Sequence, residues 1–373
     1  MSESPIRIIK GRGTSLRPQA RYDRHARAAA DDGWQRPPDE DEDPLPPATI
    51  VVDRPAKTII SKNDSPDLPF SQSINPYLGC EHGCIYCYAR PSYAYWDLSP
   101  GIDFETRLFA KSNAPELLRA ELSKPGYQCA AIMLGANTDA YQPVEREWKL
   151  TRRIIDVLCE TRHPLIIVTK SSLVERDIDL LGPMAASGLA HVCVSISSLD
   201  GELARKLEPR AATPHRRLQT VRTLAAAGIP VTVLVAPVIP QLNDKDIEAV
   251  LEKVAEAGAT SAFYGLLRLP HELKDLFRDW LFQHYPLRAG HVMSLMQQMR
   301  GGRDNDPRFG TRMTGLGIFA RLIRERFDKA CARHGLNVRR YDLRTDLFSR
   351  PRSVPVAATS SAGSAAQLDL FDR

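Results

Sequence analysis

The stretch Asn75-Pro-Tyr-Leu-Gly-Cys80-Glu-His-Gly-Cys84-Ile-Tyr-Cys87-Tyr88 determines what the rest of the chain is expected to form. It places three cysteines at a C-x3-C-x2-C spacing, so three thiolates can converge on one small group. Gly79 and Gly83 allow the backbone to curl around that group, because glycine has no Cβ to clash. Three ligands are one short of closing an iron–sulfur cluster or a structural zinc site. The spacing therefore predicts a metal centre with one open position.

The same spacing resembles the cluster motif of the radical S-adenosylmethionine (radical SAM) superfamily, in which three cysteines hold a [4Fe–4S] cluster. Tyr86 and Tyr88 also fit that motif. The resemblance implies that Cys80, Cys84 and Cys87 ligate the cluster and that SAM chelates the remaining iron. It also implies that SAM is cleaved reductively to a 5′-deoxyadenosyl radical, which abstracts hydrogen from a substrate.

Two alternatives for the three cysteines stay open at this point: free or structural thiols, and a zinc knuckle. No fourth cysteine lies nearby to complete a zinc site. His82 lies between the first two cysteines, where its ring is not expected to reach the same metal. The sequence therefore favours the iron–sulfur interpretation.

The charge, cysteine count and apolar runs of the chain indicate its location and the partners to expect. The chain has 373 residues, a net charge of only +5 and seven cysteines, an odd number with no paired framework. Such cysteine usage predicts a reducing, cytoplasmic location. No apolar run reaches the ~18 residues that a membrane span needs, so no membrane partner is expected. The small net charge says little about a nucleic-acid partner.

Strand and helix patterns alternate between residues 66 and 270. Strands are expected at 130–135, 164–170, 191–197, 230–237 and 261–269, and helices at 145–162, 175–187, 214–227 and 244–257. Continuously apolar strands separated by helices indicate a parallel sheet buried on both faces. With one more strand just before Cys80, the prediction is an α/β fold, a partial (β/α)6 TIM-type barrel, which the resemblance also implies. Functional residues of such folds lie at the C-terminal ends of the strands.

Polar residues follow these expected strands. The run Asn-Thr-Asp-Ala-Tyr-Gln-Pro at 137–143 resembles a signature of the uncharacterised branch of the superfamily that is similar to spore photoproduct lyase. The resemblance implies a SAM pocket, with the SAM amino group near Thr138 and Asp139 and its carboxylate near Lys170. An ordinary polar loop and a surface lysine are the alternatives. The cofactor-binding candidates are Tyr88, Asn137, Thr138, Asp139, Lys170, Ser195, Ser197 and Arg210.

Three further expectations concern these strand ends. Arg210 either pairs with the SAM carboxylate or forms a salt bridge with Glu208. Asn243 or the next residue is expected to cap the following helix. Spore photoproduct lyase is thought to return a hydrogen atom through a cysteine beside its SAM-binding loop, whereas the loop at 135–139 has none and Asn137 lies near that place. Tyr141 or another tyrosine is the candidate hydrogen donor, and Tyr141 is the one placed in the catalytic set.

The chain is expected to divide into four segments: a flexible basic and acidic segment at 1–65, the barrel at 66–270, a helical, basic extension at 271–348 and a flexible tail at 349–373. The basic half of the first segment either touches a phosphate backbone or is a solvated tail. A Met stripe at 293, 296 and 299 is expected in the core. Arginines clustered across 300–344 favour a polyanionic substrate.

The tail ends in Gln-Leu-Asp-Leu-Phe, which resembles the peptide that binds the bacterial sliding clamp. The partner-binding candidates are Gln367, Leu368, Leu370 and Phe371. We expect a radical SAM enzyme that acts on DNA as a repair lyase-like enzyme, with a reductant such as flavodoxin or ferredoxin. The alternatives are radical SAM modification of RNA or protein, and a non-catalytic iron–sulfur or zinc adaptor tethered to the clamp.

Overall fold

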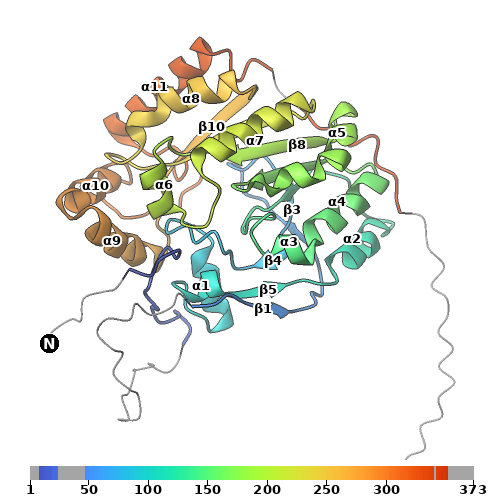
Figure 1. The fold of residues 1–373 in the computed structure, drawn as a ribbon, viewed down its shortest axis with the longest axis horizontal. Coiled ribbons are helices and arrows are strands. Elements are labelled where there is room, and N and C mark those ends of the chain that lie inside the picture. The colour runs from blue at the N-terminus through green and yellow to red at the C-terminus, as the bar shows by residue number, and fades with distance from the viewer. Residues whose placement is uncertain (1–7, 24–46, 340–341, 352–373) are drawn as a thin grey trace, which may run out of the picture.

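The structure is a computed structural model of the chain, and it describes residues 8–23, 47–339 and 342–351 (Figure 1). The clamp-binding candidates Gln367, Leu368, Leu370 and Phe371 lie outside the described residues. So do Arg340 and the acidic block at 39–43. No helix of the described part is both long and apolar enough to cross a membrane.

The main sheet has seven strands in the order β10-β9-β8-β7-β6-β3-β2. Its parallel strands are β3 (Gln72–Ile74), β6 (Ile132–Leu134), β7 (Leu165–Thr169), β8 (Ala190–Ser195), β9 (Val231–Val238) and β10 (Ser261–Leu266). Each pairs in parallel with its neighbours, and β2 (Ile60–Lys62) adds an antiparallel edge beside β3. The predicted parallel sheet of six β/α units is confirmed, with β3 as the strand before Cys80.

Helices cover the outside of this sheet (Figure 1). They are α2 (Ala114–Leu122), α4 (Leu150–Glu160), α5 (Ile178–Ala186), α7 (Pro214–Ala226), α8 (Ile247–Glu256) and α11 (Gly317–Arg333). Their apolar stripes explain this placement: α4 buries Ile154, Ile155 and Leu158, which recur at helical spacing. Every residue of β8 is buried, as expected of a strand covered on both faces.

Shorter elements close the remaining sides. A small sheet joins β1 (Ile50–Asp53), β5 (Arg107–Ala110) and β4 (Tyr77–Leu78), the strand that leads into the cysteines. The short helices are η1 (Arg90–Trp96), α1 (Asp103–Thr106), α3 (Glu145–Trp148), η2 (Ser172–Asp177), α6 (Gly201–Leu207) and η3 (Asp244–Asp246). α9 (Leu273–His284) and α10 (Pro286–Gln298) pack together at one side (Figure 1).

The helix expected at 145–162 is in fact two helices. Lys149 has a φ of 51°, in the left-handed region, so it ends α3 and starts α4 in a new direction. The break leaves the buried carboxylate of Glu145 free to accept from the Thr151 amide at 3.0 Å. A continuous amphipathic pattern does not reveal such a break, because both halves keep the same apolar face.

The described parts of the segment 1–65 pack against the barrel through β1, β2 and the buried Arg12. Arg12 donates to the backbone carbonyl of Glu105 at 2.9 Å, so it is not available to a phosphate backbone. The suggested phosphate contact is therefore wrong for Arg12. The division of the chain into four segments stays a prediction.

Many arginines of the basic C-terminal extension already have partners within the protein. The ion pairs are Arg312–Asp67, Arg308–Asp306, Arg326–Glu248 and Arg344–Asp346. Arg300 is buried and donates to the carbonyls of Leu267 and Arg312 at 2.7 Å. These partners offset part of the positive charge across 300–344, which clustering in the sequence does not show, and the polyanionic substrate stays a prediction. The Met stripe lies in the core, as expected.

Candidate metal centre

The three motif cysteines lie on one loop, residues 79–88, which follows β4 and is called the cysteine loop below. Their thiols form no disulfide; Cys80 and Cys84 are buried and Cys87 is partly buried. Burial, the Asp139 carboxylate and the other two thiols raise the pKa of Cys80 well above its usual value. Burial is also the main cause that raises the pKa of Cys84 to about 12, against the opposing charge of Lys170. The thiols therefore lie within electrostatic reach of one another and need positive charge to ionise.

This donor set fits a [4Fe–4S] cluster. Iron supplies the positive charge that three buried thiolates need, and each thiolate binds a different iron. Within residues 8–23, 47–339 and 342–351, no three His, Cys, Asp or Glu side chains are close enough to hold one metal ion. A structural zinc ion needs four ligands within roughly 2.3 Å. Three thiols with one open position match the ligand set of the cluster.

One side of the cysteine loop is held by a buried arginine from η1. Arg90 donates to the carbonyl of Cys84 at 2.8 Å and to that of Gly83 at 3.2 Å, and it pairs with the buried carboxylate of Glu105. Glu105 also accepts from the Gly13 amide at 2.9 Å. A Cβ at Gly13 would overlap the carbonyl of Gly83. The N-terminal segment thus acts as a wedge against the cysteine loop.

The other side is held by the run 137–143. The Gln142 amide group donates to the Gly79 carbonyl at 3.0 Å and accepts from the Glu81 N–H at 2.9 Å. Thr138 Oγ1 donates to the Tyr77 carbonyl at 2.9 Å, just before the cysteine loop. The exposed Asn137 is held through its backbone N–H, which donates to Asn75 Oδ1 at 2.8 Å. This run therefore positions the metal centre, whether or not it also touches SAM.

Asp139 joins three strand ends. Its carboxylate accepts from Thr169 Oγ1 at 2.8 Å and from the Lys170 amide at 2.6 Å, and it lies 3.3 Å from His82 Nδ1. Burial raises the pKa of Asp139, but His82 and Lys170 outweigh burial and lower it to about 2. The contact with the SAM amino group stays a prediction, since this carboxylate already has protein partners.

Lys170 and Glu208 form the charged side of the centre. Burial lowers the pKa of Lys170, but Cys84, Glu208 and Asp139 outweigh it and raise that pKa, so the ammonium stays protonated. Glu208 accepts from the Tyr86 hydroxyl and pairs with the buried Arg217. A charged lysine beside Cys84 can neutralise a thiolate or meet a carboxylate.

Arg210 and the serines are tied into the same loops. Arg210 Nη2 lies 3.1 Å from Glu81 Oε1, so the suggested salt bridge with Glu208 is wrong. The backbone carbonyl of Ser195 accepts from Arg217 at 2.9 Å, and that of Ser197 accepts from Asn243 at 2.8 Å.

The expected capping role of Asn243 is also wrong. No side-chain capping bond is made at the start of η3. Instead, Asn243 donates to the Pro237 carbonyl at 2.9 Å and accepts from the Ile239 amide at 2.7 Å. It fixes the loop that leaves β9.

Tyr141 is not brought to this centre. Its side chain is fully buried, and its hydroxyl donates to Asp177 Oδ2 at 2.9 Å. Burial and the Asp177 charge raise its pKa well above the usual value. The assignment of Tyr141 as hydrogen donor is therefore not supported, because the phenol faces a carboxylate in the core. Tyr88 is half exposed, and its hydroxyl donates to the carbonyl of Ala136.

Several residues that fix the centre were not among the sequence candidates. They are Arg90, Glu105, Gln142, Arg217 and Gly13. Gln142 lies inside the run 137–143, so the sequence signal for that run could have identified it. The other residues belong to no sequence motif and contact the centre only because the chain folds as it does.

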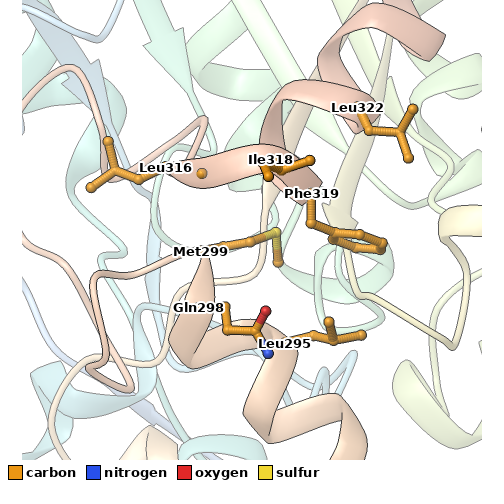
Figure 2. Close-up of a pocket in the computed structure, with 8 residues that line it drawn as sticks. Leu295, Gln298, Met299, Leu316, Ile318, Phe319 and Leu322 are labelled. Carbon is orange, nitrogen blue, oxygen red and sulfur yellow. The ribbon is translucent and has the colours of Figure 1, made fainter.

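An apolar pocket of about 490 Å³ lies between α10 and α11 (Figure 2). It is lined by Leu295, Gln298, Met299, Leu316, Gly317, Ile318, Phe319 and Leu322. Gln298 supplies its one polar side chain, and no residue of the cysteine loop lines it. This pocket is therefore separate from the metal centre.

Comparisons with known proteins agree with this geometry. The family model described as Radical SAM superfamily matches residues 74–254. An uncharacterised protein of Mycobacterium tuberculosis (strain H37Rv) is 39% identical over 221 residues, which are 59% of this chain and 65% of that protein. An uncharacterised protein of Methanocaldococcus jannaschii is 30% identical over 213 residues, which are 57% of this chain and 76% of that protein. The chain thus spans slightly under two thirds of the mycobacterial relative.

Solved structures share the fold. Spore photoproduct lyase complexed with dinucleoside spore photoproduct has a TM-score of 0.54 at 17% identity, covering 77% of this chain and 80% of that chain. At this identity the likeness concerns the fold alone. The family match runs from the last residue of β3, through the cysteine loop, into α8, and so includes the whole metal centre described above. The chain belongs to the radical SAM superfamily.

Proposed function

We propose that this protein is a radical SAM enzyme that abstracts a hydrogen atom from DNA, as a repair lyase-like enzyme. Its cofactors are those of its superfamily, a [4Fe–4S] cluster and SAM. The observation that carries the proposal is the placement of three thiols on one loop, two of them buried, with the charged Lys170 beside Cys84 at the end of β7. When bound, the reduced cluster and SAM supply a 5′-deoxyadenosyl radical.

The chain's own residues hold and shield this chemistry. Cys80, Cys84 and Cys87 would ligate the cluster, and Lys170 would meet the SAM carboxylate. The Tyr86 hydroxyl donates to Glu208, and both side chains are buried, so water is kept from this side of the centre. A water-excluded site strengthens the electrostatic contacts within it and limits side reactions.

The proposed DNA substrate draws on the shared fold and on the resemblance of the run 137–143. A spore photoproduct lyase with a bound dinucleoside photoproduct shares the fold, but the identity is too low to carry its substrate over. The loop after β6 has no cysteine, so a different hydrogen donor is needed. The sliding clamp at Gln367–Phe371, a flavodoxin or ferredoxin reductant and a cytoplasmic location belong to the same proposal.

An anaerobic assay tests the chemistry first. Reconstitute the protein with iron and sulfide, reduce it, add SAM and measure 5′-deoxyadenosine with and without ultraviolet-irradiated DNA oligonucleotides. Cys84→Ala should abolish the product. Cys159→Ala, a partly buried cysteine on α4, should leave it unchanged. Loss in both variants, or a wild type that assembles no cluster, would refute the enzymatic proposal.

The same assay tests whether DNA is the substrate. Irradiated DNA should stimulate 5′-deoxyadenosine formation or undergo repair, as read by mass spectrometry of the digested oligonucleotide. Stimulation by RNA or by a protein fraction, with none by DNA, would leave the radical SAM chemistry in place and refute the DNA assignment.

A further inference from the structure

Arg268 follows β10 at the C-terminal edge of the sheet and has almost no internal partner. It is partly buried, and its Nε is fully shielded without a hydrogen-bond acceptor. Among the described residues, the acceptor recorded for it is the thioether of Met313, 3.8 Å from Nη1. A guanidinium carries five N–H donors, and sulfur is a weak acceptor. Arg268 therefore presents unused donors at the strand ends.

The surroundings of Arg268 carry an excess of positive charge. Burial and the neighbouring Arg312 lower the pKa of Arg268. Burial and Arg268 itself lower the pKa of Arg300 to about 10. The carboxylate whose charge is felt by Arg268, that of Asp67, is bound by two nitrogens of Arg312, at 2.5 and 2.6 Å. Arg268 is thus repelled by neighbouring cations and lacks a carboxylate of its own.

The positions around Arg268 are fixed. The Leu266 amide donates to the Met313 carbonyl at 2.9 Å, which ties the segment 308–313 to the end of β10. Arg300 donates to the carbonyls of Leu267 and Arg312, on both sides of the same contact. The backbone that carries Arg268 is thus fixed before an anion binds, which reduces the ordering cost of binding.

Two exposed aromatic rings lie near Arg312 and Arg268. Phe309 is 56% exposed, and the Arg312 guanidinium lies 4.6 Å from the centre of its ring. Tyr88, at the end of the cysteine loop, is 50% exposed, and its phenol lies within electrostatic reach of Arg268. Aromatic faces beside arginines are the combination that binds single-stranded or extruded nucleotides, by stacking on bases and pairing with phosphates.

We propose that Arg268 binds a phosphodiester group of the nucleic-acid substrate at the mouth of the barrel, with Phe309 stacking on an adjacent base. This inference rests on the proposed function and names the residue that would orient its substrate. It does not compete with the SAM carboxylate, which is assigned to Lys170 after β7. Two strands, β8 and β9, separate β7 from β10 in the sheet.

Binding of a short oligonucleotide gives the first test. The probe is fluorescein-labelled hexathymidylate, measured by anisotropy with the reconstituted protein at several salt concentrations. Arg268→Gln should weaken binding roughly tenfold, in line with loss of a charged hydrogen bond. It should also reduce the salt slope by about 0.7, the value for one phosphate contact on a single strand. Unchanged cluster absorption would show that the variant is folded.

The matched control is Arg321→Gln. Arg321 lies on α11, and its side chain is 68% exposed. Its Nε is 3.9 Å from the Glu325 carboxylate, so this surface ion pair is weak. Its loss removes the same charge from the protein without touching the strand ends. Equal weakening in both variants would mean a general charge effect and would overturn the assignment of Arg268.

Chemical protection gives a test that does not require a substrate turnover. Phenylglyoxal modification of Arg268 is followed by mass spectrometry in the wild-type protein. The dinucleotide TpT should slow this modification several-fold, whereas the uncharged methylphosphonate analogue of TpT should not. Equal rates with and without TpT would overturn the inference.

The outcomes separate this inference from the proposed function. If hexathymidylate binds and Arg268→Gln binds it equally well, the role of Arg268 is refuted and the DNA proposal stands. If neither nucleotide probe binds but acetate protects Arg268, the residue serves a carboxylate. That result would refute both the phosphodiester inference and the DNA substrate, and would leave the radical SAM chemistry untouched.

Discussion

Replacement of Arg90 by Met should destabilise the protein by about 3–5 kcal/mol, even without a bound cluster. Arg90 and Glu105 form an ion pair in which both side chains are fully buried. Removal of one partner of such a pair leaves an uncompensated buried charge, which typically costs about 3–5 kcal/mol. The carbonyls of Gly83 and Cys84 also lose a donor. The loss of stability is therefore expected to affect the backbone of the cysteine loop.

The loss should depend on pH in a defined direction. Burial already raises the pKa of Glu105 above its ordinary value, and Arg90 opposes that rise. Without Arg90 the folded-state pKa moves further up, so the folded state binds a proton that the unfolded state releases above about pH 4.3. The variant therefore loses stability as pH rises toward that folded pKa, by about 1.4 kcal/mol per pH unit. The difference in the free energy of unfolding between the wild type and Arg90→Met should therefore grow between pH 5 and 7.

Urea unfolding of cluster-free, reduced protein, followed by circular dichroism at several pH values, measures both effects. The double variant Arg90→Met/Glu105→Gln should lose the pH dependence. Arg153→Met removes an exposed pair with Glu116 and should cost less than about 1 kcal/mol. A deficit for Arg90→Met that matches this control, or that shrinks as pH rises, would refute the reasoning.

Three further changes probe the support of the cysteine loop. Gly13→Ala should cost about 1–3 kcal/mol through overpacking and reduce bound iron per chain; a variant with wild-type melting temperature and iron content would contradict the wedge. Gln142→Leu should cost about 1–3 kcal/mol and speed cluster loss to a chelator, because two buried backbone groups lose their partner; an unchanged release rate would count against this role. Asp139→Asn should cost about 2 kcal/mol at pH 7, because the folded pKa is about 2 against an ordinary 3.8. That deficit should vanish as pH falls from 4 toward 2 in urea titrations, and a constant deficit would show that ionisation is not its cause.

The parts of the fold that could be predicted are those encoded locally. Each strand of the barrel is a short apolar run, and the three cysteines lie within eight residues of one another, so both could be found from neighbouring positions. The partners of the cysteine loop could not be found in this way. Gly13 meets Glu105 across 92 positions, and Arg210 meets Glu81 across 129. No periodicity links such residues.

In the candidate site, too, the sequence indicates which residues are present but not which partners they contact. The sequence predicts Thr138, Asp139 and Lys170 as polar residues at strand ends, and the structure places them there. Their hydrogen-bond partners could not be predicted from the sequence, because a polar side chain on a loop can bind either another part of the protein or a ligand. Tyr141 illustrates this: the run that contains it reaches the centre, but its own side chain turns into the core toward Asp177.

The bond between Arg210 and Glu81 has a consequence for the order of biosynthesis. At a synthesis rate of about 5–20 residues per second, the ribosome needs roughly 6 to 26 s to add the 129 positions between the two residues. In the later part of that interval the three thiols have left the ribosome, while the segment with Glu208 and Arg210 that covers them does not yet exist. Oxygen and stray metal ions can reach the cysteines in that time. Slower elongation lengthens this interval, so at the same slowed rate aerobic cells should yield a smaller fraction of protein that can bind a cluster than anaerobic cells.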